Sequence, residues 1–205
     1  VPEGDDYRLR WFTPKVEVKL CGHATLASGY VVLNILKPAQ DRVVFHTLSG
    51  PLKVWRDTSP ARLAMSLPAA SSIACAAPAG LVEALGAQPA EVLSANFNGP
   101  YLMAVFDRED VVRHLTPDLA AVAKLCDGLV VTAPANARTD YDVISRFFAP
   151  AKGVAEDPVT GSAHSQLIPY WSKRLGRKDI TAYQASERGG FLYCTDAGER
   201  VILRG

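Results

Sequence analysis

Short apolar runs rich in β-branched and aromatic residues recur along the chain and predict an architecture built mainly of strands. Two short helices are also predicted, at 78–85 before Gly86 and at 118–125 after Thr116-Pro117, a favourable N-cap followed by proline. The predicted strands are 7–12, 43–48, 52–56, 62–67, 91–97, 101–106, 128–132, 141–148, 179–184, 190–194 and 199–204.

Two longer helices are predicted at 22–36 and 161–175. The first carries no charge from Ala24 to Leu36 and is largely apolar on every face. A helix that is apolar all round is buried all round, so we expect it to be threaded through a curved sheet. The second contains Pro169, which predicts a kink.

The approaches to these two helices resemble each other. Arg-Trp-Phe-Thr-Pro at 10–14 matches Arg-Phe-Phe-Ala-Pro at 146–150, an offset of 136 positions. Gly-His-Ala at 22–24 matches Gly-Ser-Ala at 161–163, an offset of 139, so the second copy holds three extra residues. We predict a pseudo-symmetric α+β protein with domains at 1–76 and 77–205. The alternative is a chance similarity between two strand–loop–helix units.

Composition adds limits rather than a function. The 205 residues are 48% apolar and 21% charged, with a formal net charge of +1, which is typical of soluble globular chains. Near-zero charge removes the usual electrostatic argument for a nucleic-acid partner. The longest uncharged stretch, 63–82, contains prolines, serines and many alanines, so it predicts a linker rather than a membrane span.

The cysteines and the missing motifs narrow the chemistry further. Four separated cysteines form no CxxC pair, and no charged-then-apolar leader is visible, so we expect reduced thiols in a cytoplasmic protein. No second Cys/His cluster supports a metal site. GxGxxG, Walker A and GxSxG patterns are absent from the sequence, so nucleotide-binding and serine-hydrolase functions lack support. We expect no cofactor.

Glycines directly before the two long helices predict anion sites, because helix N-termini present backbone N–H groups and a positive dipole end. We expect the N–H groups of 22–24 and 161–163 to face one cleft between the domains. His23, Ser162 and Asp157 would converge there on a proton-transfer site, with the Thr160 hydroxyl adding a hydrogen bond. The helix terminus also predicts a neutral His23.

Each candidate has a structural alternative. His23, Thr160 or Ser162 could cap a helix, and Asp157 before Pro158 is an ordinary turn residue. Glu17 lies among apolar residues and is interpreted as a structural acid, with a site role as the less favoured alternative. The turn at 96–100 leaves open a cleft role for its central residues, Asn98 and Gly99.

Two longer segments resemble a known family. Residues 10–27, with Arg-Trp-Phe-Thr-Pro, Glu17-Val18 and Leu-Cys-Gly-His-Ala-Thr-Leu-Ala at 20–27, are similar to the first signature of the PhzF-type phenazine-biosynthesis-like proteins. Glu-Asp-Pro-Val-Thr-Gly-Ser-Ala-His at 156–164 resembles the second. The resemblance implies the diaminopimelate-epimerase-like fold, in which two similar barrel-like sheets each wrap around a central helix. It also implies a homodimeric, cofactor-free isomerase with its active site between the domains.

The same resemblance assigns roles to individual residues. It places the catalytic groups at His23, Asp157 and Ser162 and implies proton relocation on a small carboxylate substrate. It also implies a main acid/base glutamate in a segment upstream of the part that corresponds to Val1, a role that Glu3 and Glu17 do not match. The substrate-binding positions that it favours are Gly22, Ala24, Thr160, Gly161 and Ala163.

Two rival functions remain open on the same fold. A two-thiol racemase or epimerase needs one cysteine before each helix. Cys21 fits the first place, but Thr160 occupies the second, which disfavours this chemistry. A non-catalytic protein that binds small carboxylates would keep both glycine turns and lack the base.

Overall fold

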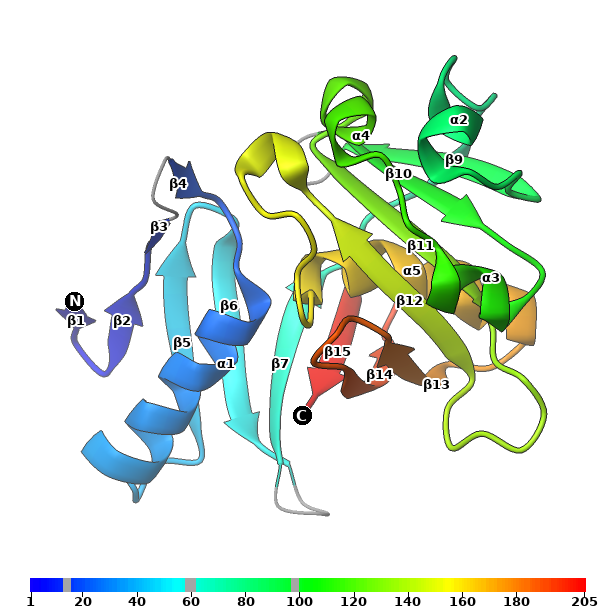
Figure 1. Cartoon of the computed structure of the whole chain (residues 1–205). Coiled ribbons are helices and arrows are strands. Elements are labelled where there is room, and N and C mark those ends of the chain that lie inside the picture. The colour runs from blue at the N-terminus through cyan, green and yellow to red at the C-terminus, as the bar shows by residue number, and fades with distance from the viewer. Residues whose placement is uncertain (13–15, 58–61, 97–99) are drawn as a thin grey trace.

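The computed structural model describes residues 1–12, 16–57, 62–96 and 100–205. Thr13 and Pro14 of the repeated motif lie outside the described residues, as do Asn98 and Gly99 of the predicted turn. Within the described part, one sheet contains thirteen strands in the order β1-β2-β5-β6-β7-β15-β14-β13-β12-β11-β10-β9-β8. A separate pair, β3-β4, lies near the start of the chain (Figure 1).

Most strands follow the predicted pattern, but the predicted strand 7–12 is divided between β2 and β3, which belong to different sheets, and β1, β4 and β8 were not predicted. Their bounds are β1 (Pro2–Glu3), β2 (Asp6–Arg8), β3 (Trp11–Phe12), β4 (Glu17–Val18), β5 (Arg42–Thr47), β6 (Gly50–Arg56), β7 (Leu63–Pro68), β8 (Ile73–Ala74), β9 (Glu91–Asn96), β10 (Pro100–Val105), β11 (Gly128–Pro134), β12 (Val143–Phe148), β13 (Asp179–Gln184), β14 (Gly190–Asp196) and β15 (Arg200–Arg204). The helical segments are α1 (Gly22–Val31), η1 (Val32–Leu36), α2 (Leu81–Leu85), α3 (Glu109–His114), α4 (Leu119–Leu125), η2 (Pro150–Lys152) and α5 (Gly161–Leu175).

The sheet joins both halves of the chain. β15 pairs with β7 in antiparallel register, with Leu203 opposite Met65 and Val201 opposite Leu67. These apolar side chains belong to one core that also includes residues of α5 and of β5 and β6. A second core lies on the outer face of β9–β12, where α2, α3 and α4 cover the sheet (Figure 1). The arrangement fits the predicted α+β class, and the predicted boundary at residue 76 stays a prediction.

Helix α5 is the central helix of the second half. It packs against β7, β13, β14 and β15. Leu167, Ile168 and Trp171 are fully buried, and the indole N–H of Trp171 donates to the Thr132 hydroxyl at 3.0 Å. Pro169 lies inside the helix, which continues without interruption to Leu175. Burial of this helix is therefore confirmed.

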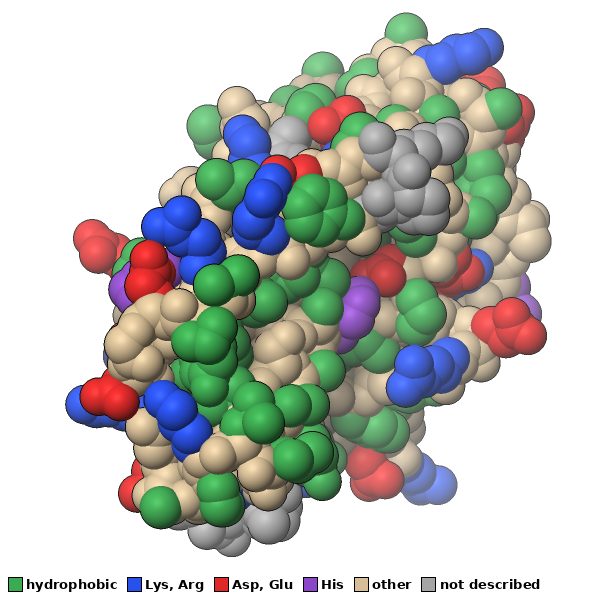
Figure 2. All heavy atoms as spheres, turned by 90° about the vertical axis from the view of Figure 1, so that its left-hand side faces the viewer, with side chains coloured by type: hydrophobic (Ala, Val, Ile, Leu, Met, Phe, Trp, Pro, Cys, Tyr) green, Lys and Arg blue, Asp and Glu red, His purple; other side chains and the backbone are tan. Residues whose placement is uncertain are grey.

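Helix α1 corrects the matching prediction for the first half. Its inner side packs on β5, β6 and β7, and a Cβ at Gly29 would lie only 2.5 Å from Val54 Cγ1. Its outer side is exposed, with Tyr30 at 57%, as is Ile35 of the following η1 at 64%, and Figure 2, which faces this side, shows hydrophobic side chains gathered there. Full burial was wrong because the described strands of this half cover the helix on one side alone.

The short helices differ from the sequence prediction in their details. Asp118, not Thr116, caps α4, because its carboxylate accepts from the N–H groups of Ala120 and Ala121. Helix α2 begins at Leu81, later than predicted, and ends at Leu85, directly before Gly86, whose φ of 67° favours glycine. Helix α3 was not predicted. None of the helices among the described residues is long and apolar enough to cross a membrane.

Candidate active site

Helices α1 and α5 meet at their N-termini. Each is preceded by a residue with extended backbone, Cys21 with φ −142° and Thr160 with φ −117°. A Cβ added at Gly22 would lie 2.9 Å from the Gly161 Cα, so only glycine permits this approach. The predicted convergence of the two glycine turns therefore holds.

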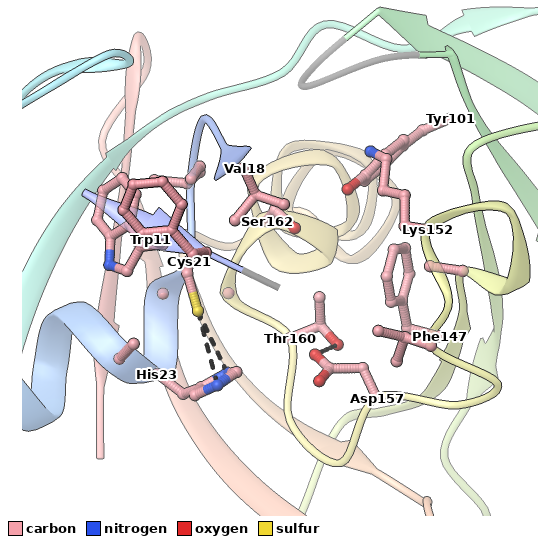
Figure 3. A pocket seen from close by; sticks show the side chains of 17 residues that line it. Trp11, Val18, Cys21, His23, Tyr101, Phe147, Lys152, Asp157, Thr160 and Ser162 are labelled. Carbon is pink, nitrogen blue, oxygen red and sulfur yellow. Dashed lines mark hydrogen bonds between the residues drawn. The ribbon is translucent and has the colours of Figure 1, made fainter. Parts of the chain in front are cut away.

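The two N-termini open on one cleft of about 420 Å³. Polar side chains from both turns face it, together with an apolar wall that comes from β3, β4, β10 and β12 (Figure 3). The lining residues are Trp11, Phe12, Val18, Leu20, Cys21, Gly22, His23, Ala24, Tyr101, Phe147, Ala149, Lys152, Val154, Asp157, Thr160, Gly161 and Ser162.

At the α1 N-terminus, a thiol and an imidazole lie together. Cys21 Sγ is 3.6 Å from His23 Nε2 and 3.9 Å from His23 Nδ1. The contact with Cys21 raises the pKa of His23 to about 9, with further contributions from the Asp157 carboxylate and the Val159 carbonyl that outweigh partial burial. This shift favours the imidazolium form of His23, in the direction opposite to the neutral state that the helix terminus predicts.

At the α5 N-terminus, a hydroxyl and a carboxylate are held in a fixed arrangement. The Thr160 hydroxyl donates to Asp157 Oδ2. Fully buried Gln184, on β13, accepts from the Thr160 N–H at 2.7 Å. Its amide NH₂ donates to the Asp157 carbonyl at 2.7 Å and to Thr160 Oγ1 at 3.1 Å. Gln184 thus fixes the loop that carries Asp157.

Most of the predicted site residues reach the cleft. His23, Ala24, Asp157, Thr160 and Ser162 line it with the two glycines, and Figure 3 shows Cys21 and His23 on one side and Asp157 with Thr160 on the other. Ala163 is the exception: it is 1% exposed, packs into the core and does not line the cleft, because the first turn of α5 carries it inward.

Glu17 has the structural role that the sequence favoured. Both of its carboxylate oxygens accept from the Arg10 guanidinium, at 2.9 and 2.8 Å, across the β3–β4 pair. That contact lowers the pKa of Glu17 and raises the pKa of Arg10. Glu17 does not line the cleft.

Sequence reasoning missed two residues at the site, Gln184 and Lys152. Gln184 follows a strand pattern in which it looks like any other inward position, and only the fold brings it to the Asp157 loop. Lys152 follows Pro150, a residue of the repeated motif, but the motif itself does not indicate a cation there. Among the described residues, no group of three or more His, Cys, Asp or Glu is placed to hold a metal ion.

Comparisons with known proteins agree with this geometry. The family model for phenazine biosynthesis-like proteins, PhzC-PhzF, matches residues 2–205. An uncharacterized isomerase of Pseudomonas aeruginosa is 48% identical over 201 residues, which cover 98% of this chain and 74% of that protein. A crystal structure of a PhzF-family phenazine biosynthesis protein from Enterococcus faecalis is 39% identical with a TM-score of 0.90, over 100% of this chain and 76% of that one.

A predicted epimerase from Pseudomonas aeruginosa shares the fold at 19% identity, with a TM-score of 0.70 over 100% of this chain and 78% of that chain. The fold is thus the diaminopimelate-epimerase-like fold that the family resemblance implied. The matching model, the close relative and the facing glycine turns lead to one assignment: the chain belongs to the PhzC-PhzF family of phenazine biosynthesis-like proteins.

Proposed function

We propose that the cleft catalyses the isomerisation of a small carboxylate by relocating a proton, without a cofactor. The observation that carries this proposal is the meeting of two glycine-started helices beside an imidazolium and a carboxylate. Two relatives from Pseudomonas aeruginosa, 48% and 45% identical, are each named as an uncharacterized isomerase, which supports the same reaction class.

The two helix N-termini would bind the substrate carboxylate. Backbone N–H groups in the first turn have no partner within the helix, and the dipole there favours an anion by about 0.3–1 kcal/mol per helix. Because the turns at Gly22 and Gly161 face each other, one carboxylate can accept hydrogen bonds from both. The Ser162 hydroxyl, which lines the same cleft, adds a further donor.

Proton transfer would use groups on both sides. The His23 imidazolium can give a proton to one carbon or oxygen of the substrate. The Asp157 carboxylate, oriented by the Thr160 hydroxyl, can accept a proton from the substrate or stabilise the proton as it leaves the substrate. The family resemblance implies a glutamate as the main acid/base, and none of the described cleft residues is a glutamate. We therefore assign His23 and Asp157 an assisting role in the reaction. We also propose that the protein acts as a homodimer in the cytoplasm, as the family resemblance implies.

Solvent exchange tests the proposal whatever the product of the reaction is. The protein is incubated in D₂O with a set of small unsaturated and α-substituted carboxylates, and deuterium on carbon is followed by NMR with no cofactor added. We expect deuterium to enter at least one substrate. His23→Ala and Asp157→Asn should each slow its entry about 10²–10⁴-fold, the usual contribution of a general acid or base.

Two matched variants control for charge and folding. Asp5→Asn changes an exposed aspartate, and His114→Ala changes an exposed histidine, both outside the cleft. Both should exchange deuterium at the wild-type rate. Wild-type rates in His23→Ala or Asp157→Asn would remove that residue from the reaction, and binding without any exchange would favour a carboxylate-binding protein.

A further inference from the structure

The wall of the cleft away from His23 differs from the side that holds the two glycine turns. It is formed by the aromatic rings of Tyr101 and Phe147 and by Ala149 and Val154. Lys152 lies there beside Tyr101 (Figure 3). Among the described residues that line the cleft, Lys152 is the only lysine or arginine.

Lys152 is held at this wall rather than extended into solvent. It ends the short helix η2 that follows β12, and its side chain is 20% exposed. Its ammonium lies 4.9 Å from the centre of the Tyr101 ring, a cation–π contact that keeps the charge on the cleft side of the loop.

The ammonium of Lys152 has a carboxylate nearby, that of Asp127. The Asp127 Oδ2 atom forms an ion pair with Nζ at 3.8 Å, and the Asp127 side chain is 40% exposed. Burial lowers the pKa of Lys152, and the Asp127 charge opposes that shift. An ammonium carries three N–H donors, so an anion that enters the cleft can accept a charge-assisted hydrogen bond from Lys152 in addition to the contacts that Lys152 already makes.

We propose that Lys152 binds a second anionic group of the substrate, so that the substrate is a diacid with a short apolar or planar body. One carboxylate would occupy the two glycine turns, the body would lie against Tyr101 and Phe147, and the second acid would reach Lys152. This inference rests on the proposed function, because it takes the glycine turns as the anchor for the first carboxylate.

Calorimetric titration with benzoate and with its 1,3- and 1,4-dicarboxylates tests the proposal at fixed ionic strength. These probes share one planar body and differ in the second acid. We expect at least one diacid to bind wild-type protein about tenfold more tightly than benzoate, the effect of one charge-assisted hydrogen bond. Lys152→Met should bring that ratio to within about twofold, because Met keeps the unbranched stem without the charge.

Two further variants separate the site from general charge effects. Lys152→Arg keeps the cation and should keep most of the preference, whereas Lys124→Met removes an exposed lysine outside the cleft and should leave the ratio unchanged. If benzoate and both diacids bind the wild type equally, or if Lys152→Met leaves the diacid-to-benzoate affinity ratio unchanged, the proposed role of Lys152 is overturned. The proposed function would be unaffected by either result. Failure of every carboxylate to bind would instead count against the glycine turns and the proposed function.

Discussion

The N-termini of α1 and α5 have the same backbone and different chemistry. Val18, Cys21 and His23 at the first correspond to Asp157, Thr160 and Ser162 at the second, each 139 positions later, and all six line one cleft. The carbonyls of Cys21 and Thr160 even accept the same kind of hydrogen bond, from a side chain four residues on. A symmetric backbone can thus bind one anion from two sides, while unlike side chains divide the acid and base roles.

The ion pairs next to the two N-termini also differ in burial. Arg10 pairs with Glu17, and Arg146 pairs with Glu156, again at matching positions of the repeat. The first pair is largely exposed, with Arg10 at 58%, but Arg146 is 13% exposed and also donates to the Leu115 carbonyl at 2.6 Å. The α5 side is therefore the more firmly held of the two, and the α1 side the more open to solvent.

The ion pairs provide the largest expected contrast. Arg146→Met removes a bidentate partner from Glu156 and a donor from the C-terminal carbonyls of α3, and should destabilise the fold by about 3 kcal/mol. Arg10→Met removes an exposed pair and should leave the denaturation midpoint near that of the wild type. Urea unfolding of both variants measures the contrast, and equal losses would show that the two pairs support the fold alike.

Gln184 should give the next largest effect. Gln184→Met keeps the volume but leaves the Thr160 N–H, the Thr160 hydroxyl and the Asp157 carbonyl without this partner, at a cost of about 2–3 kcal/mol. Gln88→Met is the matched control, because Gln88 makes one local hydrogen bond to the Pro89 carbonyl. Thermal unfolding compares them. Equal melting temperatures for the two variants would mean that the Asp157 loop is held by other contacts.

The facing glycines test the symmetric part of the comparison. Gly22→Ala and Gly161→Ala place a methyl group against the same contact from opposite sides, 2.9 Å and 3.0 Å from the other glycine's Cα. Each should destabilise the fold by about 1–2 kcal/mol, within the usual cost of overpacking. Ala27→Ser, on the exposed side of α1, should change stability little. A large difference in stability between the two glycine variants would show that only one of the two helices can shift to relieve the contact between Gly22 and Gly161.

Local patterns in the sequence predicted what depends on local chemistry. The strands, Gly86 at the end of α2, and the two glycine turns follow from residue type and spacing. The burial of α1 could not be predicted. An apolar sequence permits a helix to be buried on every side, but it does not determine how many strands cover the helix. The N-cap of α4 was predicted at Thr116, but Asp118 takes that position because its carboxylate accepts hydrogen bonds from two backbone N–H groups of the helix.

Side-chain partners from distant strands were equally beyond prediction. Gln184 contacts Asp157 and Thr160 only because β13 pairs beside β12, and a strand pattern does not indicate that register. The charge of His23 was predicted from the helix terminus alone. It depends instead on Cys21, two residues away and on the same turn, and on Asp157 from the other half of the chain.

The smallest expected effect on stability concerns the protonation of His23, because solvent screens the charge of this exposed side chain. With a pKa of about 9 against an ordinary 6.5, protonation of His23 stabilises the fold fully below about pH 6.5 and loses that contribution as the pH rises through 9. Cys21→Ala removes the largest cause of the raised pKa and should move the titration of the His23 ring, followed by NMR, toward lower pH. Cys75→Ala, an exposed cysteine far along the chain, should not move it. If the wild-type ring titrates near pH 6.5, or if Cys21→Ala leaves its midpoint unchanged, the thiol does not hold His23 as a cation. The positive end of the α1 dipole would then determine the pKa of His23, just as it is proposed to favour the anion that both turns bind.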